Sequence, residues 1–443
     1  MSRPRAPGKT FSRRRDGKML SCLGPGDKNR VNRAMSEFIS ISEISREQIK
    51  RKEELCSMVS PAAYGLARFL RKAAYLPFLL EGVRVRGFEH LPSREEPAPI
   101  LAFAHKKFHD FFAVVEFVVA RPLERFHNLT VLAQGGLFGG IYPYRDMVPR
   151  FLKNVLTRRP VAALCRFFGA YVGRKFSGVD AFPAYRKGRD VPDSEELYNA
   201  PDFAGPLITG MSYDEFQRFA NRRTMESVIK VQQLMESENR SFVIFPEGGY
   251  LHDGTVNEPQ GMMGLTAFRK KRSAVFISLS YDELCPDFWG RSIAWMNLTP
   301  PRNPPENKRE IPEYLENVRR ELSQGAVILA SHLISLALRE LSGNGGFSRE
   351  EFEKRFEELS RQALAAPFPC DPALAEESYR RERLKRFYRY RGRRWFKKQG
   401  ALWRLREDIM ERYAKSERSV NEMEWNCNNV SCFIDWLQEE APA

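Results

Sequence analysis

The 443-residue sequence lacks several patterns that mark common classes of protein. It contains no run of about 18 uncharged apolar residues, the shortest stretch that forms a membrane-spanning helix. It contains no G-x-S-x-G sequence, and no Lys followed by Ser or Thr closes the glycine-rich stretch 135–140. We therefore expect no transmembrane span. Hydrolases with a nucleophile elbow and P-loop nucleotide-binding proteins are also disfavoured.

Cysteine is sparse, with seven scattered residues and no C-x-x-C pair. Such isolated thiols are typical of the reducing cytoplasm and argue against a disulfide framework or a zinc knuckle. The chain begins without the apolar core of a secretory signal, and we interpret residues 1–34 as a disordered basic tail. An organellar transit segment, which is also rich in Arg and Ser, is the alternative interpretation of these residues.

Positive charge is concentrated in two segments. Residues 1–34 hold ten Lys or Arg against two Asp, and residues 380–406 hold thirteen against a single Glu, while the whole chain has a net charge of +15. The rest of the chain is therefore slightly acidic. Local positive charge of this kind predicts an anionic partner, either a membrane surface or nucleic acid.

Aromatic residues are interleaved with the cations of segment 379–406. They are Tyr379, Phe387, Tyr388, Tyr390, Trp395, Phe396 and Trp403. Rings among arginines suit single-stranded nucleic acid by stacking, and they equally suit an anionic bilayer by anchoring at its interface. A third interpretation is a solvated basic face whose rings pack on the protein.

Hydrophobic periodicity divides the chain after the basic tail into three parts. Residues 35–82 predict amphipathic N-terminal helices, the second of which either lies on a membrane surface or packs on the protein. Residues 83–300 alternate short apolar runs with helical stretches, which indicates an α/β domain. Inside it, residues 176–210 predict an irregular insert rich in Pro, Gly and charge. Residues 301–443 predict a helical C-terminal extension.

The apolar runs also predict individual elements. The predicted strands are 83–86 at the sheet edge, 100–104, 129–133, 241–245 and 274–280, with a short extended stretch at 170–172. The predicted helices are 110–120, 151–168, 213–238, 312–341 and 349–365, and the basic segment is taken as helical too. Polar residues follow the strands directly, so we expect a site at the carboxyl edge of the sheet.

Two histidines and an aspartate fall within residues 105–110 of a chain that has six histidines in all. His105 and His109 are four residues apart, which on a helix would place both on one face as metal ligands. Lys106 and Lys107 lie between them, and two ammonium groups beside a dication are electrostatically unfavourable. We therefore expect no metal site here.

His105 and Asp110 form a different kind of pair. Five residues of regular helix correspond to about 140° of rotation, too far for a hydrogen bond between the two side chains. They meet only if His105 lies on the loop after strand 100–104 and Asp110 lies in the first helical turn. A carboxylate that orients an imidazole is what a general base needs. From the spacing alone, an ordinary polar helix terminus is the alternative.

A second polar cluster follows strand 241–245. The strand stops at Pro246, and Glu247 comes next between turn-forming residues. In isolation, such a glutamate often does no more than cap a turn.

Taken together and in this order, the two clusters resemble the glycerolipid acyltransferase family, whose members make lysophosphatidic and phosphatidic acids. The family's H-x-x-x-x-D block is matched by His105 and Asp110. Its F-P-E-G block is matched by Phe245, Pro246, Glu247 and Gly248. Its downstream D-G is similar to Asp253-Gly254, and its fourth block is similar to FISLSYD at 276–282. The resemblance spans roughly residues 83–300 and implies a mixed, mostly parallel sheet flanked by helices.

The resemblance implies a specific chemistry. His105 would take the proton of an acceptor hydroxyl while Asp110 holds the imidazole, and the alkoxide would attack the thioester of an acyl-CoA or acyl carrier protein. Arg174 or Lys175, in the sequence GAYVGRK, would bind the phosphate of a glycerol phosphate or lysophospholipid. The turn at 245–248 would bind substrate, with Glu247 and the Gly248 backbone positioning the acceptor. No metal or redox cofactor is implied.

The sequence departs from the family pattern at several positions. Lys107 replaces a common serine, His109 an apolar residue, Gly249 the usual Thr or Ser, and Tyr250 a frequent arginine. These departures motivate an alternative, an inactive member that binds anionic lipid or nucleic acid. The acyltransferase interpretation favours a cytoplasmic enzyme peripherally bound to an anionic membrane, with segment 379–406 as the anchor and nucleic acid as the less favoured partner.

Overall fold

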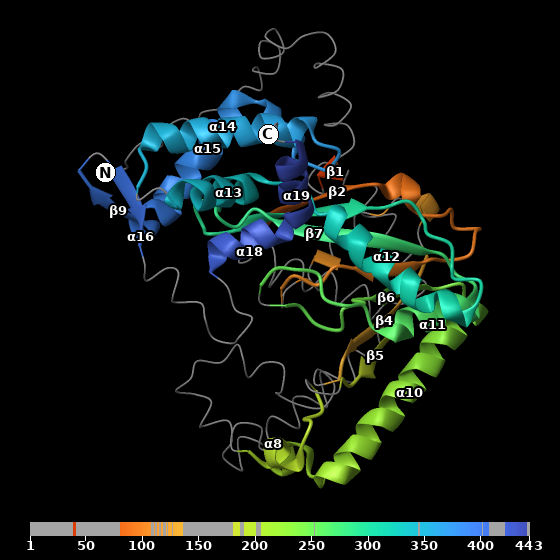
Figure 1. Cartoon of the computed structure of the whole chain (residues 1–443). Helices are drawn as coiled ribbons and strands as arrows, with labels where there is room; N and C mark the ends of the chain where they lie inside the picture. Colours follow the sequence, from red (N-terminus) through yellow and green to blue (C-terminus); the bar gives the residue numbers. More distant parts are fainter. Residues whose placement is uncertain are drawn as a thin grey trace, which may run out of the picture.

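The computed structural model describes residues 39–40, 80–135, 180–200, 205–343, 346–406 and 421–440, apart from short gaps at 108–109, 111–112, 115–116, 118–120, 122, 126, 187–189, 252 and 401. An eight-stranded sheet has the order β1-β2-β8-β7-β3-β6-β4-β5 (Figure 1). Its strands are β1 (Ile39–Ser40), β2 (Leu80–Arg86), β3 (Ile100–Phe103), β4 (Leu129–Gln134), β5 (Ala181–Ala184), β6 (Ser241–Ile244), β7 (Ala274–Tyr281) and β8 (Ser292–Leu298). The pairings β1–β2 and β7–β8 are antiparallel and the others parallel, which confirms the mixed, mostly parallel α/β fold.

The central strands are buried on both faces. All residues of β3 and β6 are buried, and continuous apolar runs such as these are typical of parallel strands covered on both sides. Because successive side chains point to opposite faces, Leu101 and Phe103 join one hydrophobic cluster, whereas Ile100 and Ala102 join the other.

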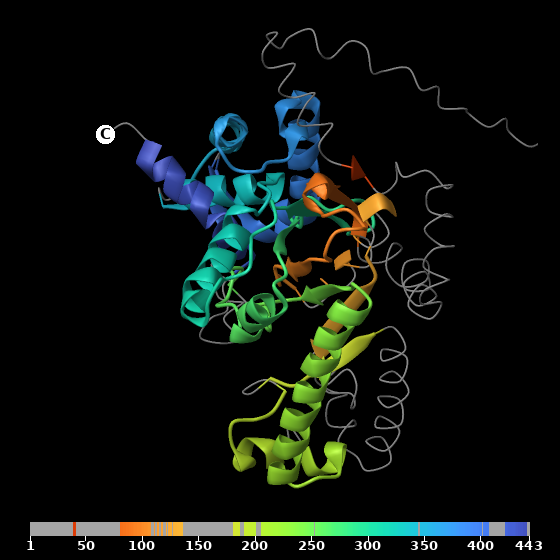
Figure 2. The ribbon, with the colours of Figure 1, turned by 90° about the vertical axis from the view of Figure 1, so that its right-hand side faces the viewer.

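Helices cover this second face. They are α10 (Tyr213–Ser237), which a capping box of Ser212 and Glu215 begins, α11 (Gly261–Lys270) and α12 (Ile311–Gln324). Figures 1 and 2 show α10 extending away from the sheet toward α8 (Glu195–Asn199). There, Val191 and Tyr198 form a small core with Phe216 of α10.

Several element predictions need correction. Strand 83–86 is not at the edge, because β1 pairs with it. The segment 176–210 contains β5, α8 and α9 (Gly205–Thr209), so its described part is not irregular. Sequence reasoning missed β5 because Pro183 breaks the strand pattern, yet proline is tolerated on an edge strand. It also missed β8.

The predicted helix 312–341 is in fact two helices, α12 and α13 (Ala330–Ser342). The break follows Gly325, where an added Cβ would lie 2.4 Å from Ser278 Oγ of β7. Close approach of the chain to the sheet thus requires glycine at this point. The predicted helix 110–120 is confirmed at its described residues 110, 113, 114 and 117.

At 39–40 and 80–82, the predicted N-terminal helices are wrong because these residues form β1 and the start of β2. Their remaining residues lie outside the described part of the chain, as do the tail 1–34, helix 151–168 and the extended stretch 170–172. Within the described residues, no helix is both long enough and apolar enough to span a bilayer.

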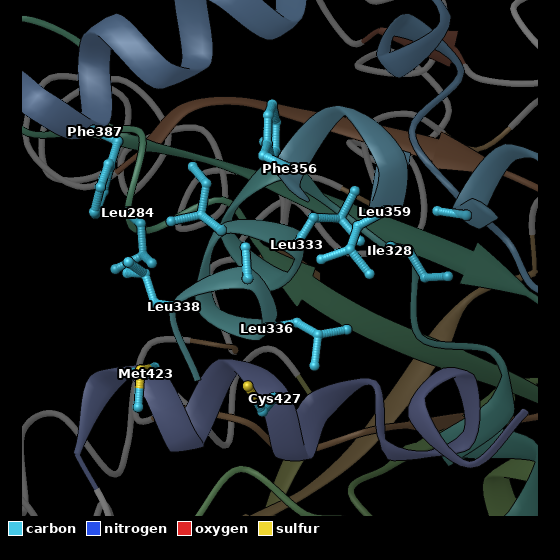
Figure 3. Packing of buried hydrophobic residues seen from close by; sticks show 14 of the residues in the cluster. Leu284, Ile328, Leu333, Leu336, Leu338, Phe356, Leu359, Phe387, Met423 and Cys427 are labelled. Carbon is cyan, nitrogen blue, oxygen red and sulfur yellow. The ribbon is translucent and has the colours of Figure 1, made fainter. Parts of the chain in front are cut away.

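The C-terminal extension builds a separate hydrophobic core (Figure 3). Its helices are α13, α14 (Arg349–Ala365), α15 (Glu377–Phe387), α18 (Glu422–Asn429) and α19 (Ser431–Glu440). The core also takes in Leu284 and Cys285 from the β7–β8 loop, which joins the extension to the sheet. Among the described residues, these helices confirm the predicted helical extension, whereas β9 (Phe396–Gln399) and β10 (Leu402–Leu405) form an antiparallel hairpin where a helix was expected.

Candidate active site

The structure brings His105 and Asp110 together at the junction between a strand and a helix. His105 lies two residues after β3, and Asp110 lies in helical backbone. The His105 Nδ1 atom lies 2.9 Å from Asp110 Oδ2. This is the arrangement that the spacing allowed, and it places the pair at the carboxyl edge of the parallel strands.

Asp110 is fully buried and is held by four donors. Its Oδ2 atom accepts from the backbone N–H of Lys106 at 2.5 Å and of Lys107 at 2.7 Å, as well as from the imidazole. Its Oδ1 atom accepts from the hydroxyl of Tyr281, the last residue of β7, at 2.6 Å. An ionised carboxylate can only accept hydrogen bonds, so the imidazole proton sits on Nδ1 and Nε2 is left to take a proton from a substrate.

Aromatic rings enclose the imidazole. The ring of Phe245 lies 4.7 Å from that of His105, and the ring of Tyr250 lies 5.0 Å away in an edge-on orientation. The His105 side chain keeps 16% of its surface exposed. The imidazole is therefore held between rings and keeps a small part of its surface accessible to solvent.

The turn after β6 places Glu247 behind His105. Glu247 accepts from the backbone N–H of His105 at 2.6 Å and of Asn257 at 2.8 Å, one with each carboxylate oxygen. Gly248 has a φ of +64°, which favours glycine at the turn. Burial raises the pKa of Glu247 to about 7, although the nearby Lys106 ammonium opposes the rise. Both oxygens thus stabilise the loop that holds His105, and direct contact of Glu247 with an acceptor stays a prediction.

Both lysines of this loop are engaged with the protein. Lys106 is buried and donates from Nζ to the Gly254 carbonyl at 2.8 Å, and burial lowers its pKa. Lys107 pairs with Glu283, and its Nζ lies 4.3 Å from the centre of the Trp425 ring. Burial lowers the pKa of Lys107 to about 8. His109 lies outside the described residues, so the absence of a metal site stays a prediction.

Helix α18 of the C-terminal extension closes one side of the site, which sequence reasoning missed. Besides the contact between Trp425 and Lys107, Asn428 Nδ2 donates to the Asp253 carbonyl at 2.9 Å. Gly254, at a φ of +85°, lies so close that an added Cβ would be 2.5 Å from the Trp425 carbonyl oxygen. No local sequence signal connects α18 with the D-G pair.

The two polar residues that end the FISLSYD sequence have separate roles. Tyr281 donates to Asp110, whereas Asp282 accepts from the Ser331 backbone N–H at 3.0 Å at the start of α13. Asp282 also pairs with Arg383 of α15 at 3.2 Å, and both side chains are buried. Tyr281 therefore belongs to the site, while Asp282 links the sheet to the C-terminal helices. The similarity of FISLSYD to the family's fourth block pointed to Tyr281, although it did not indicate that Tyr281 would bond to Asp110.

The predicted phosphate-binding residues Arg174 and Lys175 lie outside the described residues. A described cation does lie near the F-P-E-G turn. Arg186, two residues after β5, has its Cδ 3.4 Å from where a Cβ on Gly248 would be, and its Nε donates to Asp190 at 2.8 Å. Sequence reasoning missed Arg186 because it assigned this stretch to the irregular insert.

Six of the seven aromatic residues of segment 379–406, all except Tyr390, pack in or against the C-terminal core. Phe387 and Trp395 are buried in the C-terminal core, and Phe396 stacks on Trp403 at 4.9 Å. Several of the arginines pair with carboxylates, as Arg380 does with Glu357. The structure therefore favours the third interpretation of this segment, a basic face whose rings pack on the protein, over an aromatic anchor for lipid or nucleic acid.

No protein-family model matches the chain, and no curated protein matches its sequence. Among solved structures, the chain is similar to the crystal structure of the 1-acyl-sn-glycerophosphate (LPA) acyltransferase PlsC from Thermotoga maritima. The identity is 13%, the match covers 66% of this chain and 85% of that one, and the TM-score is 0.32. A TM-score of this size is too low to support a shared function, so the proposal below rests on the residues of the site.

Proposed function

We propose that the protein is an O-acyltransferase that moves an acyl group from a thioester to a hydroxyl group of a phosphate-bearing glycerol or lysophospholipid. The observation that supports it most is the pair of His105 with a buried Asp110. Asp110 receives four hydrogen bonds, and because no part of it is exposed it orients the imidazole and does not contact a substrate. This is the arrangement of a general base.

The reaction follows from the position of the free imidazole nitrogen. The acceptor hydroxyl gives its proton to His105 Nε2 as its oxygen attacks the thioester carbonyl. The tetrahedral intermediate collapses, the carbon–sulfur bond breaks, and the leaving thiolate takes the proton back from the imidazolium. Each turnover thus exchanges a thioester for an ester and a free thiol, and His105 ends in its starting form.

The substrates are inferred from the family-like motifs and the local charge. Arg186 beside Gly248 offers a guanidinium for an acceptor phosphate, and Arg174 or Lys175 is the further candidate from sequence. The donor is an acyl-CoA or an acyl carrier protein thioester. A cytoplasmic location at a membrane surface is part of the same proposal, because the acceptors or products are lipids.

The test is acyl transfer by the purified protein. Radiolabelled acyl-CoA and acyl carrier protein thioesters are offered with glycerol 3-phosphate, dihydroxyacetone phosphate and lysophosphatidate. We expect His105→Ala to lower kcat/KM by about 10²- to 10⁴-fold, the usual contribution of a general base. The matched control is His90→Ala, a partly exposed histidine outside the described site, which should leave transfer unchanged. Transfer that survives His105→Ala would refute the proposal, and a wild-type protein inactive on every acceptor would favour the inactive lipid- or nucleic-acid-binding alternative.

A further inference from the structure

The loop between β7 and β8 exposes two adjacent large aromatic side chains. Phe288 is 74% exposed and Trp289 is 75% exposed, more than any other large hydrophobic residue in the described part of the chain. Single exposed apolar residues are ordinary on protein surfaces, but a contiguous pair of this size usually marks a contact surface. Their rings meet edge to face at 5.5 Å, so they form one apolar knob.

Hydrogen bonds hold the loop in the shape that exposes these rings. Asp287 Oδ1 accepts from the backbone N–H of Trp289 at 2.9 Å and of Arg291 at 2.8 Å. Its Oδ2 accepts from Arg291 Nε at 2.8 Å, and Gly290, at a φ of +80°, donates to the Asp287 carbonyl at 3.0 Å. The turn is therefore built around Asp287. Because the loop is already ordered, binding through these rings need not lose further conformational entropy in the loop.

The knob belongs to the same edge of the sheet as the candidate active site. β7 runs parallel to β3, so both strands end at the edge where His105 lies. Tyr281 at the end of β7 donates to Asp110, and Glu283 in the loop pairs with Lys107. The aromatic knob thus extends from the chain segment that helps to form the site.

Helix α15, which carries exposed cations, packs against the base of the loop. Arg383 of α15 donates to the carbonyl of Cys285 in the loop, at 3.3 Å, so α15 packs against it. Further along, Lys385 on α15 and Arg389 in the π-helical turn that follows (Tyr388–Gly392) are exposed, and neither has a salt bridge within the described residues.

Arg386 of the same helix pairs with Glu81. Glu81 is next to Leu80, which is in register with Ser292 at the end of the loop. Exposed cations on a helix that packs against this loop, together with its exposed rings, match the interface of an anionic bilayer, where rings sit at headgroup level and cations meet lipid phosphates.

We propose that Phe288 and Trp289 insert into the surface of an anionic bilayer and that Lys385 and Arg389 contact its headgroups. The carboxyl edge of the sheet, with His105, would then face the lipid. The two cations belong to the segment 379–406 that the sequence suggested, whereas the inserting rings come from the β7–β8 loop, since most rings of that segment pack in the C-terminal core. The biological purpose of the contact rests on the proposed acyltransferase function, whereas the contact itself can be measured without any acyl donor.

The experiment is sedimentation of the full-length protein with sucrose-loaded vesicles, either phosphatidylcholine alone or phosphatidylcholine with phosphatidylserine. We expect Phe288→Ser/Trp289→Ser to lower partitioning onto the mixed vesicles by about 100-fold, from the loss of two inserted rings. Lys385→Glu/Arg389→Glu should weaken binding to mixed vesicles and reduce its salt dependence. The matched control is Met225→Ser/Ile229→Ser, which removes two exposed apolar side chains from α10 and should bind like the wild type.

Depth is measured separately by quenching of tryptophan fluorescence with lipids brominated on their acyl chains. Quenching should be strong for the wild type and largely lost in Trp289→Phe. Wild-type protein that stays in the supernatant, or a Phe288→Ser/Trp289→Ser variant that sediments like the wild type, would overturn the proposal. So would a wild-type dimer in analytical ultracentrifugation that this variant converts to a monomer, because the knob would then cover a second copy of the chain. Vesicle binding without acyl transfer would leave this proposal standing while the proposed function fails.

Discussion

Replacing Tyr281 with phenylalanine isolates a contact with the site that comes from a distant part of the sequence. The change removes one hydroxyl and keeps the ring in place. Asp110 Oδ2 keeps its three donors, whereas Tyr281 is the partner of Oδ1 within the described residues. The substitution therefore leaves a buried carboxylate oxygen without its hydrogen bond.

The expected magnitude follows from that geometry. A hydrogen bond to a charged group contributes about 1.5–3 kcal/mol, and a 2.6 Å bond between two fully buried side chains belongs at the upper end. We expect the free energy of unfolding of Tyr281→Phe to fall by about 3 kcal/mol. Without this bond the carboxylate can rotate, and its alignment with the imidazole loosens. If about half of the energy is also lost from the transition state, kcat falls by about 10-fold, with about 100-fold as the upper bound.

The assay compares urea unfolding with steady-state acyl transfer. KM for the acceptor should stay nearly unchanged, because Tyr281 acts through Asp110 and does not touch the substrate. Tyr379→Phe is the matched control, since the Tyr379 hydroxyl donates to the buried Asp371 carboxylate at 2.5 Å in the C-terminal extension. It should lose similar stability and retain kcat. A Tyr281→Phe protein that is destabilised but has wild-type kcat would refute the positioning role, as would equal losses of kcat in both variants.

Other substitutions test the supports of the site. Arg383→Met leaves the buried Asp282 carboxylate without its cation, so urea denaturation should show a loss of about 3–5 kcal/mol in the free energy of unfolding. Gly254→Ala places a Cβ against the Trp425 carbonyl oxygen, so amide hydrogen exchange in α18 should accelerate; unchanged protection would contradict the close packing. Burial raises the pKa of Glu247 from 4.5 to about 7, so the folded state favours the protonated carboxyl. Relative to Glu247→Gln, wild-type stability should therefore decline as pH rises from 4.5 to about 7 and then level off, as paired unfolding curves at each pH would show.

Much of the sheet was predictable because its signals are local. The runs at 100–104, 241–245 and 274–280 are apolar apart from a few serines, as is typical of strands buried on both faces, and they form β3, β6 and β7. The strand β5 was not predictable, since Pro183 and the charged residues around it are typical of a loop. Only the structure shows that β5 is an edge strand, where proline is tolerated. The edge position of 83–86 was predicted wrongly because strand order depends on contacts between distant segments.

The candidate site divides in the same way. The sequence by itself determined that His105 and Asp110 could meet only at a strand-to-helix junction, and the family-like motifs indicated this pair and the turn that presents Glu247. Only the tertiary structure decided what holds them. Tyr281 reaches Asp110 across 171 residues of sequence, and Trp425 reaches Lys107 from a helix in the extension. The physical reason is that hydrogen bonds and ring contacts act over a few ångströms in space. Contacts between residues far apart in the chain produce no periodic pattern in the sequence, so the sequence does not reveal them.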